Sequence, residues 1–168
     1  MSRKLYIIMG ETMKIKELIK LIEFYIKLPI IEFSITKKLF EEDNYRKIFN
    51  KIIRNKVENK SGVYVWMDSK TNEIYYIGMA GKINSNGLFG NHSLQKRLIA
   101  SRGRDKKTKK DIQTNDYVKN FMIENKIESL NFYIMYSKDK EPPAYLEAVL
   151  LNGFYKEKNC LPKLNKSF

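Results

Sequence analysis

Cysteine and histidine are almost missing from this chain, and each scarcity excludes a class of site. Among 168 residues, Cys160 is the only cysteine and His92 is the only histidine. One cysteine excludes an internal disulfide and a cysteine zinc cluster, and it favours a reducing, cytoplasmic location. One histidine excludes a histidine metal cage and any nuclease mechanism that needs two histidines.

Long apolar runs are also missing. No stretch of about 18 apolar residues occurs, so the sequence predicts no contact with the interior of a membrane. The apolar run at 5–9 follows two basic residues, but it is too short for a secretory signal and no small-residue cleavage site follows it.

The composition is that of a globular protein with an excess of positive charge. Apolar residues make up 43% of the chain, and its length suits one domain with a hydrophobic core. Lys and Arg number 32 against 19 Asp and Glu, which gives a net charge of +13. Such an excess favours a polyanionic partner, most often a nucleic acid.

The first 60 residues contain two helical patterns and no catalytic motif. Apolar residues recur at helical spacing over 11–28, and Pro29 ends that pattern. A second helix is expected over about 41–58, with Asp43 or Asn44 near its start. Two interpretations of 1–60 stay open: a helical cap on the core, or an arm for DNA recognition or dimer formation.

A β-hairpin is predicted over 62–78. Two strand-like runs, Gly62–Met67 and Glu73–Gly78, flank a polar turn. Each run carries a tyrosine close to a glycine, and eleven residues separate Tyr64 from Tyr76. Two tyrosines that pack across a hairpin are also an ordinary structural feature, so the hairpin alone is modest evidence for a site.

The elements after the hairpin alternate between loops, helices and one strand. A loop rich in glycine and asparagine covers 79–91, and a short helix then runs to about Ser101, with Ser93 as its expected N-cap. The strongly basic stretch 102–110 is expected to be a loop. The remaining predictions are a helix over 114–126 capped by Thr114 or Asn115, a strand over 130–136, and a helix over 141–157 that begins at two prolines.

This arrangement resembles the GIY-YIG nuclease superfamily. The pattern Gly62-Val63-Tyr64 followed by Tyr76-Ile77-Gly78 matches its signature, and the order of elements matches its core over about 62–165. The resemblance implies an α/β (α+β) fold, with a three-stranded, mostly antiparallel sheet flanked by helices. Residues 61–168 would form the nuclease core, and 1–60 would be a helical extension.

Three further residues fit the resemblance. Arg97 lies at the edge of the apolar stripe of its short helix, where a guanidinium can hold a phosphate; taken alone, it is more often a surface arginine. Glu147 shares a helix face with apolar residues, where a carboxylate is costly unless it is paired or binds a cation; a tilted helix with Glu147 at the rim is the alternative. Asn165 ends a Pro-x-Leu-Asn stretch, and by resemblance it would hold the site together by hydrogen bonds.

The resemblance assigns roles to these residues. The expected catalytic set is Tyr64, Tyr76, Arg97, Glu147 and Asn165. Glu147 would bind one Mg²⁺ (or Mn²⁺), because one carboxylate with waters and phosphate oxygens suits a hard cation. The implied activity is a metal-dependent endonuclease that cuts double-stranded DNA. The most favoured type is a type II restriction endonuclease that acts as a homodimer. The alternatives are a homing, mobile-element or repair nuclease, and a DNA-binding module that does not cut.

One departure from the family bears on the general base. Many members carry a histidine one helical turn after the arginine, and that position here is Ser101. The base role therefore falls on Tyr64, whose pKa we expect nearby cations to lower from about 10; the candidates are Lys82, Lys96 and Arg97. His92 precedes the helix, and we expect it to be structural or to contact DNA.

A different nuclease motif, an acidic residue two positions before a lysine, also occurs. Glu124-Asn125-Lys126, with Asp116 upstream, and Asp68-Ser69-Lys70 both fit it. Such matches are frequent by chance in a chain rich in lysine and acids, and the first lies in a predicted helix.

The basic residues around the hairpin and the stretch 102–110 are the predicted DNA contacts: Lys82, Lys96, Arg102, Arg104, Lys106, Lys107, Lys109 and Lys110. A solvated surface loop is the alternative for 102–110. Neutralising Lys106, Lys107, Lys109 and Lys110 together should lower DNA affinity and flatten the dependence of affinity on salt concentration, because fewer counterions are released. Binding titrations at several salt concentrations measure this slope, and an unchanged slope would assign the loop to solvent.

Overall fold

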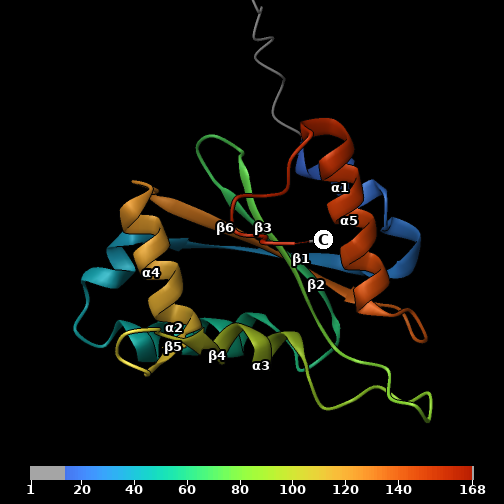
Figure 1. The fold of residues 1–168 in the computed structure, drawn as a ribbon, viewed down its shortest axis with the longest axis horizontal. Coiled ribbons are helices and arrows are strands. Elements are labelled where there is room, and N and C mark those ends of the chain that lie inside the picture. Colours follow the sequence, from blue (N-terminus) through green and yellow to red (C-terminus); the bar gives the residue numbers. More distant parts are fainter. Residues whose placement is uncertain (1–13, 168) are drawn as a thin grey trace, which may run out of the picture.

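The computed structural model describes residues 14–167, and these residues form a mixed α and β structure (Figure 1). The apolar run at 5–9 and the start of the helix predicted over 11–28 lie outside the described residues. The elements, including two 3-10 helices, follow in this order: α1 (Ile15–Lys20), η1 (Glu23–Tyr25), β1 (Ile26–Thr36), η2 (Lys37–Glu41), α2 (Tyr45–Lys56), β2 (Gly62–Asp68), β3 (Ile74–Ala80), α3 (Leu94–Ile99), β4 (Ser101–Arg104), β5 (Asp111–Gln113), α4 (Thr114–Glu124), β6 (Ser129–Ser137) and α5 (Pro143–Lys158).

The main sheet has four strands in the order β1-β6-β2-β3, and each neighbouring pair is antiparallel. The predicted hairpin is the pair β2 and β3, and β6 and α5 lie close to their predicted positions. The expected count of three strands is wrong by one, because β1 from the N-terminal segment joins the same sheet.

The N-terminal segment is therefore less helical than the sequence predicted. Its first helix ends at Lys20, and residues from Ile26 onward pair with β6 as a strand. Phe33 and Ile35 are buried between exposed neighbours, a period-two pattern that indicates a strand. The register of β1 shifts between Lys27 and Ile31, around Pro29, as suits a proline in an edge strand. The second predicted helix is present as α2.

Helices cover both faces of the sheet. Figure 1 shows α2, α3 and α4 on one side of it and α1 and α5 on the other. Every residue of β2 is buried, because both faces of this central strand are covered. Tyr64 and Trp66 belong to the core beneath α2, α3 and α4, whereas Val63 and Val65 belong to the core beneath α1 and α5.

The helix caps and the basic stretch depart in part from expectation. Ser93 caps α3 as predicted, and its side chain accepts a hydrogen bond from the Lys96 backbone. The predicted cap of α4 is wrong: the hydroxyl of Thr114 instead donates to the carbonyl of Ala100 at 2.7 Å. The stretch 102–110 is not only a loop, because β4 and β5 pair as a small two-stranded sheet around its turn.

None of the helices within residues 14–167 has the length and apolar content to cross a membrane.

The first glycine of the hairpin is fixed by packing between strands. A Cβ on Gly62 would lie 2.1 Å from the backbone oxygen of Met135 on the neighbouring strand β6. A backbone atom inside a central sheet has little room to move, so any side chain at this position forces the two strands apart.

Gly62→Ala should therefore lower the free energy of unfolding by roughly 1–3 kcal/mol, the usual cost of overpacking. Chemical denaturation measures this change. Gly90→Ala is the matched control, because the nearest atom to its added Cβ is 3.4 Å away, and it should change the stability little. Equal effects of the two substitutions would contradict the packing argument.

Candidate active site

Gly78, the second glycine of the hairpin, leaves space in which the side chains of Tyr64 and Tyr76 pack together. Gly78 lies directly opposite Tyr64 in the β2–β3 pairing. A Cβ on Gly78 would lie 2.9 Å from the Tyr64 hydroxyl and 2.5 Å from the Tyr76 ring. The two rings pack with their centroids 5.6 Å apart, and Trp66 lies 5.0 Å from Tyr76. The glycine thus provides the space in which the aromatic side chains cluster.

Arg97 is held by α3 at the mouth of a pocket. Leu94 and Leu98 bury one face of this short helix, whereas Arg97 keeps part of its surface exposed to solvent. Partial burial by itself lowers the pKa of Arg97, but the adjacent Tyr64 and Tyr76 hydroxyls outweigh it and hold that pKa above its ordinary value. Arg97 therefore stays positively charged at every pH at which the protein would work.

Glu147 projects from α5, between residues that form the core beneath that helix. Leu146 and Leu150 are fully buried, and Glu147 itself is partly buried. Within residues 14–167 its carboxylate has no hydrogen-bond or ion-pair partner. Burial raises the pKa of Glu147, and the charge of Arg97 opposes that rise without cancelling it. A partly buried carboxylate without a direct partner is costly, and a bound cation would offset that cost.

Asn165 closes the free edge of β3. Its side-chain amide donates to the Ile77 carbonyl at 2.7 Å, and its side-chain oxygen accepts from the Ile77 backbone N–H at 3.0 Å. The backbone N–H of Leu164 also donates to the Tyr75 carbonyl at 2.9 Å. The C-terminal segment thus takes hydrogen bonds that a further strand would make, and Asn165 is fixed beside the hairpin.

Four of the five predicted catalytic residues line one pocket of about 470 Å³. It lies where the edge strand β3 ends the sheet, so that α3 and β4 approach it from one face and α5 from the other. Its walls include Tyr76, Arg97, Arg102, Tyr117, Glu147 and Asn165. The fifth predicted residue, Tyr64, is fully buried and lies behind this wall.

Arg102 is the residue whose environment the sequence did not predict. Among the basic residues of 102–110, it points inward, and its Nη2 donates to the Tyr64 hydroxyl at 2.7 Å. Its guanidinium carbon lies 4.4 Å from the Trp66 ring centre, 4.6 Å from Tyr76 and 5.3 Å from Tyr117. We call these three rings the aromatic cage. A guanidinium over several rings is a favourable cation–π arrangement.

The predicted shift in the Tyr64 pKa is wrong in direction. Complete burial raises the pKa of Tyr64 well above its ordinary value, because a buried phenolate loses its hydration. The charges of Arg102 and, less strongly, Arg97 oppose that rise but do not overcome it. Arg102 donates the hydrogen bond to Tyr64. Of the three predicted candidates, Arg97 opposes the rise in the pKa, whereas Lys82 and Lys96 do not contribute.

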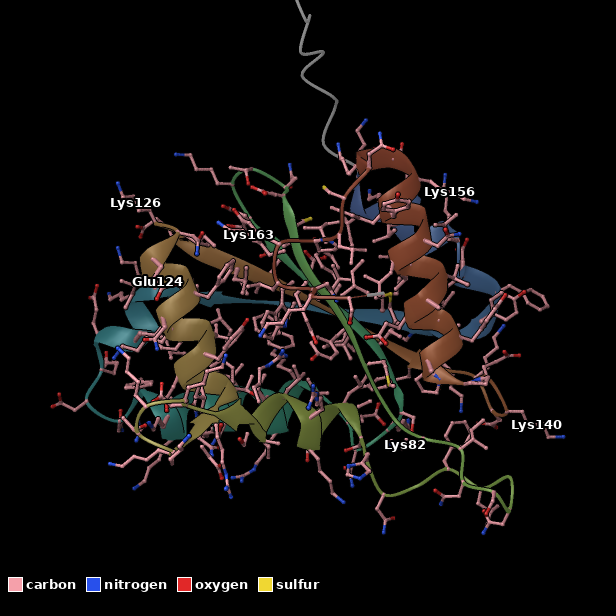
Figure 2. The ribbon with its side chains drawn as sticks, viewed as in Figure 1. Lys82, Glu124, Lys126, Lys140, Lys156 and Lys163 are labelled. Carbon is pink, nitrogen blue, oxygen red and sulfur yellow. The ribbon has the colours of Figure 1, made fainter. Side chains whose placement is uncertain are left out.

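Lys82 and Lys96 instead line a second pocket of about 460 Å³, which shares Arg97 with the first. His92 and Ser101 also line this second pocket. Figure 2 shows Lys82 at the start of the loop that follows β3. The two pockets together form a basic surface on either side of Arg97.

The remaining predicted DNA contacts lie at the end of β4 and on the turn between β4 and β5. Lys106, Lys107, Lys109 and Lys110 are exposed there, and Arg104 is exposed and paired with Asp111 at 3.2 Å. The oxygen Oδ1 of Asp105 accepts hydrogen bonds from the backbone of Lys107 and Thr108, which shapes the turn. The lysines are thus free to contact an anionic partner.

The alternative acid-and-lysine motifs do not form a site. Figure 2 places Glu124 and Lys126 at the end of α4 that is far from α3 and β4. Asp116 is already paired with Arg46 at 3.0 Å and accepts from the Tyr45 hydroxyl at 2.7 Å. Asp68 accepts hydrogen bonds from the backbone of its own turn.

No protein-family model, curated protein or solved structure matches this chain.

The burial of Glu147 has a consequence for stability. Because its pKa is raised, the folded protein holds this proton more tightly than the unfolded chain does. The free energy of unfolding that Glu147 contributes is therefore greatest below its ordinary pKa of 4.5 and falls as the pH rises through the raised value.

Glu147→Gln removes this charge, so the variant should be more stable than the wild type near neutral pH, and the difference should disappear below the ordinary pKa of Glu147. Thermal denaturation in the presence of a chelator, at neutral and at acidic pH, tests this. Glu157→Gln on the same helix is the control, because Glu157 is exposed and its loss should have little effect at either pH. A less stable Glu147→Gln protein at neutral pH would show that the carboxylate has a stabilising partner.

Proposed function

We propose that this protein is a metal-dependent DNA endonuclease that hydrolyses phosphodiester bonds. The observation that carries the proposal is that Arg97 and Glu147 line the same pocket, although their helices lie on opposite faces of the sheet. Within residues 14–167 the two side chains form no ion pair with each other. A cation and a carboxylate that line one pocket without pairing directly suit a phosphate and a metal ion, which bring the opposite charges.

Each side chain of the site has a separate proposed role in hydrolysis. Arg97 would bind the scissile phosphate through its guanidinium, with the Tyr76 hydroxyl as a second donor. Asn165 would keep β3 and therefore Tyr76 in place. A water molecule attacks phosphorus, the bond from phosphorus to the leaving oxygen breaks, and that oxygen takes up a proton. Tyr64 is the proposed acceptor of the proton from the water.

The residues present fit a single hard cation. Within the described part of the chain no group of three or more histidine, cysteine, aspartate or glutamate side chains converges, so Glu147 stands alone as a metal-binding carboxylate in the pocket. Mg²⁺ is commonly held by one or two carboxylates with waters and substrate phosphate oxygens, and Mn²⁺ would suit the same oxygen donors. When bound, the ion would neutralise the charge that develops on the leaving oxygen.

The basic surface supports DNA as the substrate. Lys82 and Lys96 flank Arg97 in the second pocket, and the exposed lysines of the β4–β5 turn extend the positive charge beyond it. A row of cations beside the reactive phosphate would contact neighbouring phosphates of the same strand. The resemblance to the GIY-YIG superfamily, carried by Tyr64, Tyr76, Arg97, Glu147 and Asn165, supports the same reaction.

Within that reaction, we favour a type II restriction endonuclease that acts as a homodimer on double-stranded DNA. The long glycine- and asparagine-rich loop between β3 and α3 resembles that branch of the superfamily. Two copies of one active site would be needed to cut both strands at a fixed position.

Digestion of DNA of mixed sequence with Mg²⁺ tests the proposal. Discrete fragments are expected, and a parallel reaction with a chelator should show none. Random nicks would assign the protein to the homing, mobile-element or repair type of nuclease. DNA binding without any cutting would contradict the endonuclease and leave a DNA-binding module.

Glu147→Gln should lower the cleavage rate by at least about 100-fold and spare DNA binding, because a bound metal ion supplies several kcal/mol of charge stabilisation. Single-turnover cleavage and a binding titration on the same duplex measure the two effects separately. Glu157→Gln, on the exposed side of α5, should cut at the wild-type rate. Normal cleavage by Glu147→Gln would remove the proposed metal ligand.

A further inference from the structure

Tyr64 cannot take a proton from water in the arrangement described above. Its side chain is fully buried, and it does not line the pocket that Arg97 and Glu147 share. Arg102 stands between them, because it lines that pocket and also donates to the Tyr64 hydroxyl at 2.7 Å. The bond takes one of the two acceptor positions of a hydroxyl that burial already closes to water.

We propose that Arg102 is a second phosphate-binding residue of this site, and that its move from Tyr64 onto a DNA phosphate uncovers Tyr64 for the reaction. The inference rests on the proposed function and adds to it a latch: the contact between the guanidinium of Arg102, the hydroxyl of Tyr64 and the aromatic cage of Trp66, Tyr76 and Tyr117.

The guanidinium is only partly satisfied in the latch. It has five N–H donors, and its Nε is buried without a hydrogen-bond partner. Within residues 14–167 no carboxylate forms an ion pair with Arg102, so its charge faces the neutral Tyr64 hydroxyl, the three rings and the pocket. The indole N–H of Trp66, in the same cluster, is likewise buried without a partner.

A phosphate in the pocket offers what the latch lacks. Two phosphate oxygens can accept two parallel hydrogen bonds from one guanidinium, and they carry the opposite charge. The Tyr64 hydroxyl offers one neutral acceptor. A phosphate bound near Arg97 would therefore compete with the Tyr64 hydroxyl for Arg102, and both its charge and its geometry favour the phosphate. Arg102 and Arg97 line the same pocket, so Arg102 is already close to that position.

The backbone next to Arg102 allows such a movement. Gly103 follows it with a φ of +142°, a conformation open to glycine, and no atom lies within 4 Å of the position where its Cβ would be. Arg102 itself belongs to the short β4–β5 sheet, which is separate from the main sheet. The side chain can leave the cage without a shift in the strands that hold Tyr64 and Tyr76.

The chain carries its own reporter for this movement, because Trp66 is the single tryptophan. A charged guanidinium 4.4 Å from the indole affects its fluorescence, and withdrawal of that charge changes the emission. The experiment titrates a short duplex into the protein with a chelator present, so that DNA binds without being cut. Anisotropy of a label on the duplex reports binding independently of Trp66.

Wild-type protein should show a change in Trp66 emission that saturates together with DNA binding. Arg102→Gln should bind DNA with affinity reduced by less than about 10-fold and show no such change, because an amide can still donate to Tyr64 but a phosphate does not attract it. Its single-turnover cleavage should fall by about 100-fold, as for other lost transition-state donors.

Arg104→Gln is the matched control. It removes the same charge two residues along β4, but Arg104 is 77% exposed and pairs with Asp111 outside the cage. This variant should keep the emission change at saturating DNA. Thermal denaturation checks that both variants are folded. If the Arg102→Gln protein does not fold, the titration of the wild-type protein still tests the latch.

Unchanged Trp66 emission in wild-type protein saturated with DNA would overturn the latch, as would an equal change in wild type and Arg102→Gln. If the wild type cuts DNA in Mg²⁺ while its emission stays constant, the latch alone fails and the proposed function stands. If no DNA binds, the proposed function and the latch fail together.

Discussion

The candidate site depends on the way the main sheet ends at β3. A sheet edge presents unpaired backbone groups, and here the Asn165 amide and the Leu164 backbone satisfy those of Ile77 and Tyr75. No further strand follows, so the helices of the two faces approach each other beyond the edge. The pocket between Arg97 and Glu147 lies in that space, and its position is a consequence of where hydrogen bonding in the sheet stops.

The site combines groups that are unfavourable in the folded chain alone. Glu147 is partly buried without a partner, and burial raises its pKa. Tyr64 is buried with its hydroxyl bound to a cation, and the Nε of that cation is itself unsatisfied. The Glu147 carboxylate and the Arg102 Nε each lower stability, because these polar groups lose hydration without a partner that compensates for it. Such costs are typical of sites that a ligand completes.

Close packing around glycine links the fold to this chemistry. Gly62 brings β2 against β6, and Gly78 brings the Tyr64 and Tyr76 rings together. The Tyr76 ring then forms, with Trp66 and Tyr117, the aromatic cage that receives Arg102. The same hairpin that stabilises the centre of the sheet therefore also sets the environment of the proposed base.

The sequence by itself determined the hairpin, the positions of most helices, the Ser93 cap of α3 and the residue types that line the pocket, because these depend on local spacing and on chemistry carried by single side chains. It did not determine that Ile26–Thr36 forms a strand, since that choice depends on hydrogen bonds to β6, about 100 residues away. Nor did it predict the place of Arg102, which looked like its neighbours in a basic run. Only the tertiary structure decided which of those cations turns inward, because the aromatic cage that receives it is assembled from β2, β3 and α4.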